Sequence, residues 1–161
     1  MPLITFATIL LVLFTVELLE PVQIWIIQPF TAVVAQASAV ILQAFDSTVR
    51  AHGIVLSNVE TGAAVSIQPG CNGVEAIIVV LAAIAATPAS WKQKLIGLGL
   101  GFLAIQILNV IRIVSLFYLL QWNPVWFEWA HLYLWQALIM LDGLIVYLLW
   151  VRTLPAPAVS P

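Results

Sequence analysis

The sequence predicts an all-α integral membrane protein with about four transmembrane helices, an interfacial amphipathic helix and a short extracytoplasmic β-hairpin-like segment. Hydrophobic residues make up 63% of the 161 residues and charged residues only 7%, and the mean hydropathy is +1.12. A soluble domain carries roughly 25% charged residues because it needs a solvated face. Residues 1–161 therefore form a single membrane-embedded domain.

The low charge also narrows the classes of function. A formal charge of −2 on so few ionisable groups argues against nucleic-acid binding, which needs a basic stripe. The single cysteine, Cys71, cannot form an intramolecular disulfide. The N-terminus lacks a basic n-region and an Ala-x-Ala site, so it is expected to be a retained anchor rather than a cleaved signal.

The N-terminal segment, residues 1–21, is predicted to be the first transmembrane helix. The stretch from Leu3 to Leu19 is about 17 residues long, just enough to span a bilayer, and is interrupted only by Glu17. Glu20 and Pro21 then end the apolar run. Carboxylates at that end are expected near an interface, because a charge in the middle of the bilayer costs a few kcal/mol.

Residues 22–70 are predicted to be extracytoplasmic or interfacial. From Pro29 to Phe45 the apolar residues recur at helical spacing on one stripe, which favours a helix lying in the interface, with a second span as the alternative. Two short β-branched runs, residues 53–57 and 64–68, flank a turn-forming segment and predict a hairpin. Unpaired strand edges do not face lipid, so this hairpin belongs outside the hydrocarbon.

Residues 71–152 are predicted to form a three-helix core, followed by a Pro-rich tail at 153–161. A short basic loop, Trp91 to Lys94, separates the first two helices, and an aromatic interfacial stretch ending at Trp129 precedes the third. The expected helices are Asn72 to about Pro88, Leu95 to Leu120, and about Leu132 to Val151.

The loops of this core predict its orientation. Lys92, Lys94 and Arg152 fall on one side, which the positive-inside rule makes cytoplasmic. Residues 46–71 and 121–131 are then extracytoplasmic.

Three polar residues are expected at the outer side of the three core helices. Cys71 precedes the first helix, where the electropositive helix end lowers the pKa of a thiol. Arg112 lies roughly 25 Å along the second helix from Leu95, near the outer boundary. His131 begins the third helix.

Each of these residues has a simpler interpretation on its own. A lone membrane cysteine is usually an apolar filler, an arginine can snorkel to the interface, and a histidine among aromatic residues is usually interfacial. Together at one depth, Cys71, Arg112 and His131 indicate catalysis. A thiolate attacks a carbonyl, the guanidinium stabilises the oxyanion, and the imidazole protonates the leaving amine.

Several other polar residues have supporting or surface roles in this interpretation. Asn109 and Gly73 are supporting residues, and Gly73 allows a close backbone approach to the sulfur. Glu75 either pairs with Arg112 or anchors its helix. Three further residues have weaker assignments: Glu128 orients His131 or is solvated, Asp142 needs a partner that the sequence does not name, and His52 lies on the surface.

Cys71-Asn72-Gly73, Asn109-x-x-Arg112 and the later His131 together resemble the exosortase/archaeosortase family, most closely the exosortase H type. The resemblance covers Pro69 to Arg152 strongly, and residues 1–68 agree with the family in general layout. It implies a multi-pass cysteine protease or transpeptidase of the bacterial inner (plasma) membrane whose active site faces the periplasm.

The resemblance also implies the substrate and the catalytic residues. The substrates would be exported proteins with a C-terminal sorting tag made of a short motif, a transmembrane helix and a basic tail. The family's catalytic Cys, Arg and His correspond to Cys71, Arg112 and His131. The tag would be cleaved through a thioester, with no cofactor and no metal.

Two other functions compete with this one. A non-enzymatic membrane scaffold or transporter subunit would use the small-residue stripe of Gly97, Gly99, Gly101 and Ala104 for helix packing. A metalloenzyme using Cys71, His131 and His52 is disfavoured, because the sequence has neither an H-x-x-x-H nor a C-x-x-C pattern.

Overall fold

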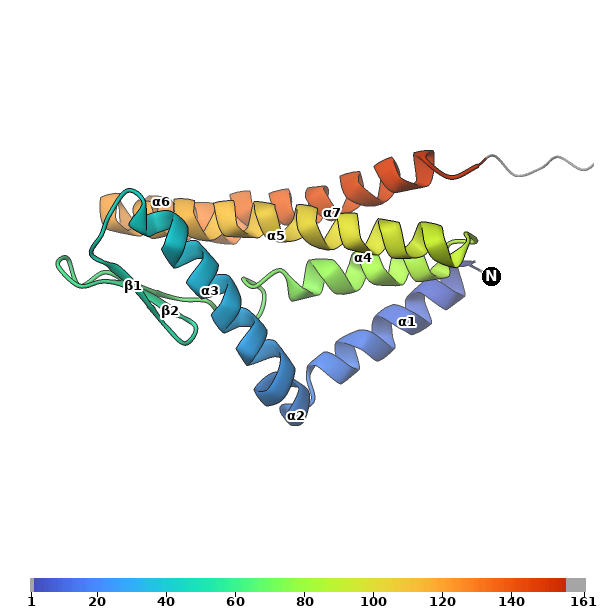
Figure 1. The fold of residues 1–161 in the computed structure, drawn as a ribbon, viewed down its shortest axis with the longest axis horizontal. Helices are drawn as coiled ribbons and strands as arrows, with labels where there is room; N and C mark the ends of the chain where they lie inside the picture. The colour runs from blue at the N-terminus through green and yellow to red at the C-terminus, as the bar shows by residue number, and fades with distance from the viewer. Residues whose placement is uncertain (1, 156–161) are drawn as a thin grey trace, which may run out of the picture.

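A computed structural model describes residues 2–155 of the chain, so most of the predicted tail lies outside the described residues. Three helices run side by side along the longest axis of the molecule, and two further helices meet in a V on one side of them (Figure 1). The three side-by-side helices, called the helical layer below, are α4 (Val74–Ala86), α5 (Trp91–Trp122) and α7 (Trp135–Arg152). The V is formed by α1 (Pro2–Glu17) and α3 (Gln28–Gln43). These two helices are joined by α2 (Glu20–Val22) and the π-helical turn η1 (Gln23–Ile27).

The N-terminal half of the chain is more continuously helical than the sequence pattern predicted. The helix expected to begin at Pro29 begins at Glu20, so that α2, η1 and α3 form one apolar helix of 24 residues. This segment is long enough to cross a membrane, as are Trp91–Trp122 and Pro124–Arg152. The chain is therefore a multi-pass membrane protein by length and composition, and an interfacial position for residues 29–45 stays a prediction.

Two further apolar helices are shorter than a full span. α1 has 16 residues and α4 has 13, which correspond to about 24 Å and 20 Å against a hydrocarbon core of about 30 Å. The described residues thus contain three helices of spanning length rather than the expected four.

The prediction of a basic loop at residues 91–94 is wrong, because these residues form the first turn of α5. The Ser90 hydroxyl accepts a hydrogen bond from the Gln93 N–H, and the Gln93 side chain accepts one from the Ser90 N–H. This capping box satisfies orphan donors at the helix start, so the helix begins earlier than the apolar run does.

The aromatic stretch predicted at residues 121–131 is helical as well. Asn123 caps α6 (Pro124–Trp129) by accepting from the N–H groups of Val125 and Trp126. α6 continues through the π-helical turn η2 (Ala130–Leu134) into α7. Trp122, Trp126 and Trp129 are exposed, as expected of interfacial aromatic residues, whereas Trp135 is buried against Leu116 and Ala130.

The predicted hairpin is part of a three-stranded antiparallel sheet of order β1-β2-β3. Its strands are β1 (Val49–His52), β2 (Val55–Asn58) and β3 (Ala64–Ser66). The pairing of β2 with β3 confirms the hairpin, and β1 was missed because its only turn signal is Gly53, whose φ of 57° permits a two-residue loop. One sheet face packs on α3 and α5 through Leu42, Val49, Leu56, Ile67 and Phe117.

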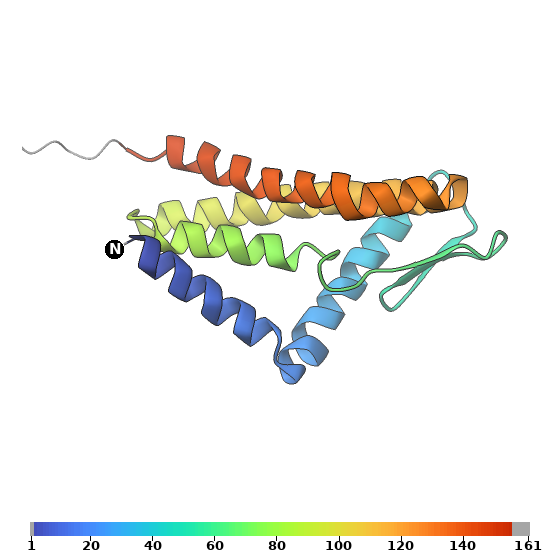
Figure 2. The same ribbon diagram turned by 180° about the vertical axis from the view of Figure 1, so that it is seen from behind.

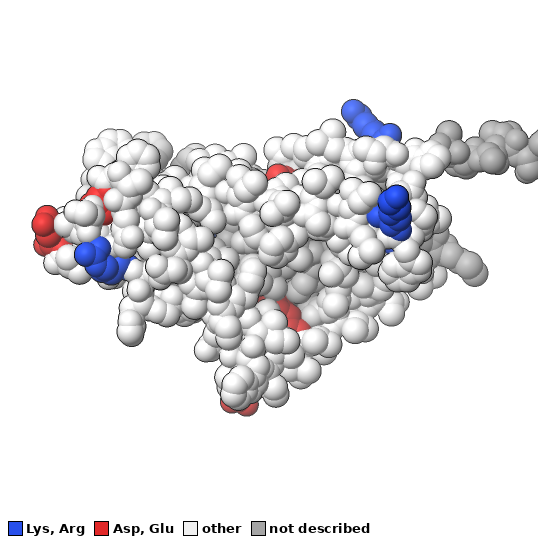
Figure 3. Space-filling model, viewed as in Figure 1, with Lys and Arg blue, Asp and Glu red and all other residues white. Residues whose placement is uncertain are grey.

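Lysine and arginine side chains lie at one end of the helical layer (Figure 3). Lys92 and Lys94 lie at the same end as Arg152, because Trp150 Nε1 donates to the Gln93 carbonyl oxygen at 3.0 Å across α5 and α7. The space-filling view shows lysine and arginine at that end and charges of both signs near the sheet, with a few acidic atoms between the two ends and at the apex of the V (Figure 3). This distribution is typical of a chain that crosses a bilayer.

Candidate active site

The loop between β3 and α4 presents Cys71. The Cys71 N–H donates to the Gln68 carbonyl oxygen at 2.9 Å, which folds the loop into a tight turn. Gly70 and Gly73 have φ values of 85° and 81°, conformations that favour glycine. Gly73 is also the N-cap residue of α4, so the thiol lies three residues before the first helical residue, Val74.

Asn72 fastens this loop to two other helices. Its side-chain amide donates to Thr31 Oγ1 on α3 at 3.0 Å and accepts from the Val74 N–H at 3.0 Å. Gln106 on α5 donates to the Asn72 carbonyl oxygen at 3.3 Å. Sequence reasoning missed Thr31 and Gln106, because neither has a recognisable spacing to Cys71.

Arg112 on α5 lies directly beside the thiol. Its Nη2 is 3.6 Å from Cys71 Sγ, and its Nη1 donates to the Gly70 carbonyl oxygen at 3.2 Å. The side chain is only 2% exposed, so this guanidinium is held inside the protein rather than snorkelling to the interface.

His131, 60 residues later in the chain, also lies beside the thiol. Its Nε2 is 3.0 Å from Cys71 Sγ. The residue lies in η2, and its ring stacks on Phe127 with a centroid separation of 5.6 Å and an interplanar angle of 15°. π-helical turns inside α-helices are frequent at functional sites, where they redirect a side chain.

The structure thus brings the three candidate residues together from a loop, α5 and η2. Burial raises the pKa of the Cys71 thiol; the Arg112 charge opposes this shift and the Glu75 carboxylate adds to it. The net direction is therefore opposite to the lowering expected from the helix end, because desolvation of the thiolate outweighs the Arg112 charge. The adjacent imidazole is placed to accept the thiol proton.

Glu75 does not pair with Arg112. Its Oε1 accepts a hydrogen bond from the N–H of Gly70, which lies five residues earlier in the cysteine loop. Arg112 donates to the carbonyl oxygen of the same residue, so the carboxylate binds the N–H of Gly70 and the guanidinium binds its carbonyl oxygen. Glu75 therefore supports the cysteine loop rather than neutralising the guanidinium.

Asn109 on α5 packs against Gly73 in the cysteine loop. A Cβ atom on Gly73 would lie 2.8 Å from Gln106 Nε2 and 3.4 Å from the Asn109 amide, so only glycine fits there without displacement. The Asn109 side chain is fully buried, and neither its amide nitrogen nor its oxygen has a hydrogen-bond partner among the described residues.

The remaining candidates lie away from this cluster. His52 is exposed on β1 and Glu128 is exposed on α6, each at a surface position. Asp142 is half-buried on α7, and its Oδ2 has no hydrogen-bond partner in the described chain. Within residues 2–155 no group of three His, Cys, Asp or Glu side chains could hold a metal ion.

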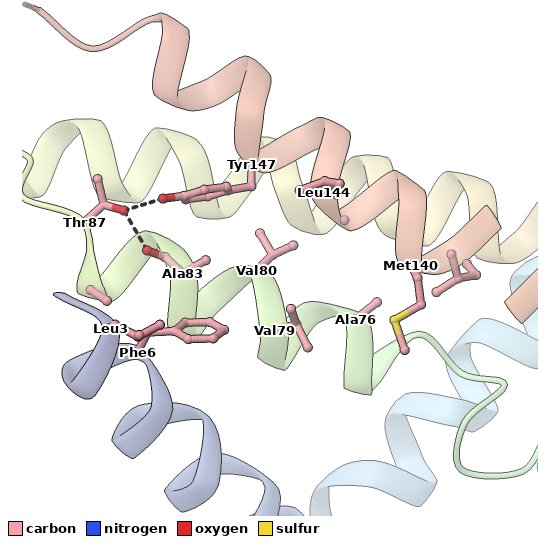
Figure 4. A pocket seen from close by; sticks show the side chains of 13 residues that line it. Leu3, Phe6, Ala76, Val79, Val80, Ala83, Thr87, Met140, Leu144 and Tyr147 are labelled. Carbon is pink, nitrogen blue, oxygen red and sulfur yellow. Dashed lines mark hydrogen bonds between the residues drawn. The ribbon is translucent and has the colours of Figure 1, made fainter. Parts of the chain in front are cut away.

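A cavity of about 410 Å³ lies between α1, α4 and α7 (Figure 4). Its lining is apolar apart from the hydrogen-bonded hydroxyls of Thr87 and Tyr147, 2.9 Å apart. It is lined by none of the three clustered residues. The chemistry of the molecule is therefore concentrated around Cys71.

Comparison with protein families gives one match. The family model described as transmembrane exosortase (Exosortase_EpsH) matches residues 2–152. No curated protein and no solved structure matches the chain.

Proposed function

Because the chain belongs to the transmembrane exosortase family, a family of cysteine-type sorting transpeptidases, we propose that it cleaves the C-terminal sorting tags of exported proteins through a thioester on Cys71. Membership confirms the family expected from the motifs around Cys71 and Arg112; the exosortase H type stays a prediction.

The observation that carries this proposal is the double contact of one sulfur atom. Cys71 Sγ lies 3.0 Å from His131 Nε2 and 3.6 Å from Arg112 Nη2. A nucleophile beside a base and beside an oxyanion donor is the minimum arrangement for acyl transfer. A structural cysteine in a packed helix interface would need neither neighbour.

In the first half-reaction, His131 Nε2 accepts the Cys71 proton as Sγ attacks the scissile carbonyl carbon. The electron pair of the carbonyl moves to its oxygen, where the Arg112 guanidinium stabilises the negative charge. When the tetrahedral intermediate collapses, the C–N bond breaks and His131 donates its proton to the leaving amine. The acyl part of the substrate stays on Cys71 as a thioester.

In the second half-reaction, an acceptor amine or water attacks the thioester carbonyl. His131 takes the proton of the nucleophile, Arg112 again stabilises the oxyanion, and the sulfur leaves and is reprotonated. Transfer follows when the nucleophile is an amine, and hydrolysis follows when it is water. Asn109, Gly73 and Glu75 are assigned to positioning.

The proposed site faces the extracytoplasmic side of the bacterial inner membrane. This placement is supported by the three basic residues at the opposite end of the helices, Lys92, Lys94 and Arg152. Exported substrates with C-terminal sorting signals would reach a thiol on that side after translocation.

Two measurements test the function. Cells carrying Cys71→Ala are expected to retain full-length tagged substrate that wild-type cells trim. Purified full-length protein mixed with a tag peptide and quenched in acid is expected to carry an acyl group on Cys71, identified by mass spectrometry and released by hydroxylamine. Normal trimming by Cys71→Ala, together with a stable stoichiometric partner, would instead support a non-enzymatic scaffold.

A further inference from the structure

The outer edge of β3 carries backbone groups without partners in the described chain. Val65 pairs with β2, and the Ile67 N–H donates to the Ile54 carbonyl oxygen at 2.9 Å, so both residues direct their backbone groups toward β2. Because these groups alternate along a strand, those of Ala64 and Ser66 point away from β2. No hydrogen bond joins them to another described residue.

The opposite edge of the sheet is covered. Gln43 on α3 donates to the Val49 carbonyl oxygen at 2.9 Å, and the Val49 N–H donates to the Asp46 carbonyl oxygen at 3.3 Å. By contrast, the side chains of Ala64 and Ser66 are exposed, and no described element packs closely on that edge. An open strand edge is a template for another extended chain.

This open edge leads directly to the nucleophile. The chain passes from β3 into the loop before α4, as the view from behind shows (Figure 2). The Gln68–Cys71 turn follows, and Cys71 comes five residues after Ser66. A peptide lying along β3 and extended two or three residues past Ser66 would cover about 7–10 Å at 3.3 Å per residue, in the direction of the cysteine loop.

We propose that the substrate segment preceding the scissile bond binds as a fourth strand, parallel to β3, by main-chain hydrogen bonds to Ala64 and Ser66. This inference rests on the proposed function. The body of an exported protein with a C-terminal signal precedes the scissile bond and lies outside the membrane, where the sheet must also lie. The preceding residues therefore run along β3 toward Cys71.

The parallel register assigns particular atoms. The substrate residue opposite Val65 donates its N–H to the Ala64 carbonyl oxygen and accepts from the Ser66 N–H. The N–H groups of its two neighbours point away from β3. In such strand addition the main-chain hydrogen bonds provide affinity. Contacts of every second side chain with neighbouring residues provide specificity.

An N-methyl scan tests this register with the full-length enzyme. The probe is a synthetic peptide from the cleavage region of an exported protein that wild-type cells trim, methylated at one backbone nitrogen at a time before the scissile bond. Methylation at every second position is expected to lower kcat/KM about tenfold or more, with little effect at the positions between. An effect that does not alternate with a period of two overturns the proposal.

A variant of the enzyme gives a second test. Ser66→Pro removes an outward N–H that the β2 ladder does not use, so the edge strand tolerates it. We expect kcat/KM to fall about tenfold through KM, while the rate of Cys71 alkylation by iodoacetamide is unchanged. The matched control is Ala51→Pro, which removes an outward N–H on the opposite edge strand and should keep wild-type cleavage.

The outcomes separate the two proposals. Normal cleavage by Ser66→Pro with an intact thiol contradicts strand addition alone and leaves the thioester mechanism standing. A wild-type enzyme that neither cleaves the peptide nor forms an acyl adduct contradicts the proposed function, and strand addition with it. Should Ser66→Pro alter the alkylation rate, the N-methyl scan decides.

Discussion

The chemistry of the cluster depends on a buried cation beside a buried thiol. Arg112 has no carboxylate partner among the described residues, since Glu75 is bound to Gly70 instead. An unpaired buried guanidinium is costly, by several kcal/mol before its hydrogen bonds are counted. A negative charge on Cys71 Sγ or on a substrate oxygen would offset the positive charge of Arg112. The guanidinium therefore stabilises the transition state more than the resting state.

The pKa of Cys71 gives a prediction on pH dependence. The thiolate is the reactive form, and burial raises the pKa of the thiol, so alkylation of Cys71 should have its pH midpoint above that of free cysteine. Glu75→Gln removes a repelling charge but keeps a hydrogen-bond acceptor for Gly70, and should move the midpoint to lower pH. Arg112→Met should move it to higher pH.

The measurement is the second-order rate of reaction with iodoacetamide across the pH range, in detergent-solubilised protein. Identical midpoints for wild type, Glu75→Gln and Arg112→Met would contradict electrostatic coupling at the thiol.

Arg112→Lys should be nearly as damaging as loss of the arginine. A lysine has one nitrogen in place of the planar fork, so it cannot place one nitrogen on the Gly70 carbonyl oxygen and a second beside the sulfur or a substrate oxygen. Loss of one oxyanion donor typically lowers kcat about 10²- to 10³-fold. The check is the cleavage rate of a tag peptide at saturating concentration, with Arg50→Lys, an exposed arginine on β1, as the control.

At the scale of elements, the start of α4 determines where the thiol points. Gly73 caps this helix with a φ of 81°, and its Cα faces the side chains of Gln106 and Asn109. A side chain at this position is strained by its backbone conformation and by the lack of space. The cysteine loop and α4 can thus keep their geometry only with glycine at this junction.

Gly73→Ala is expected to lower the free energy of unfolding by about 1–3 kcal/mol and to reduce cleavage by displacing Cys71. Thermal unfolding and peptide cleavage provide the two readouts. Gly99→Ala is the matched control, because Gly99 lies in the helix α5 with open space around its Cα and should be neutral or slightly stabilising. A Gly73→Ala protein as stable and active as Gly99→Ala would contradict the packing argument.

At the scale of the whole molecule, the charge distribution predicts topology. The exposed turn at Val59 lies beside the sheet, and the exposed Trp91 lies at the end that carries Lys92 and Lys94. In a Cys71→Ser background, Val59→Cys should react with an impermeant maleimide in intact spheroplasts, and Trp91→Cys only after permeabilisation. Asn58 is unsuitable for labelling because it is buried. The reverse pattern would invert the predicted orientation.

Much of this architecture could be predicted from the sequence. Long apolar runs identified α5 and the helix ending at Arg152, and β-branched runs around a turn identified β2 and β3. Helix starts were predicted too late at residues 91 and 124, because hydropathy does not detect the caps formed by Ser90 and Asn123. The strand β1 was missed because it has only four residues and its only turn signal is Gly53.

The sequence by itself determined that this chain is a membrane protein, that it belongs to the exosortase family, and which three residues are the candidates for catalysis. These conclusions depend on composition and on short motifs, which are local. Only the tertiary structure decided that Glu75 binds Gly70 rather than Arg112, that burial raises the pKa of Cys71, and that Ala64 and Ser66 have an open edge. Each of these depends on which distant side chains exclude water or supply a hydrogen-bond partner, and spacing along the chain does not encode that.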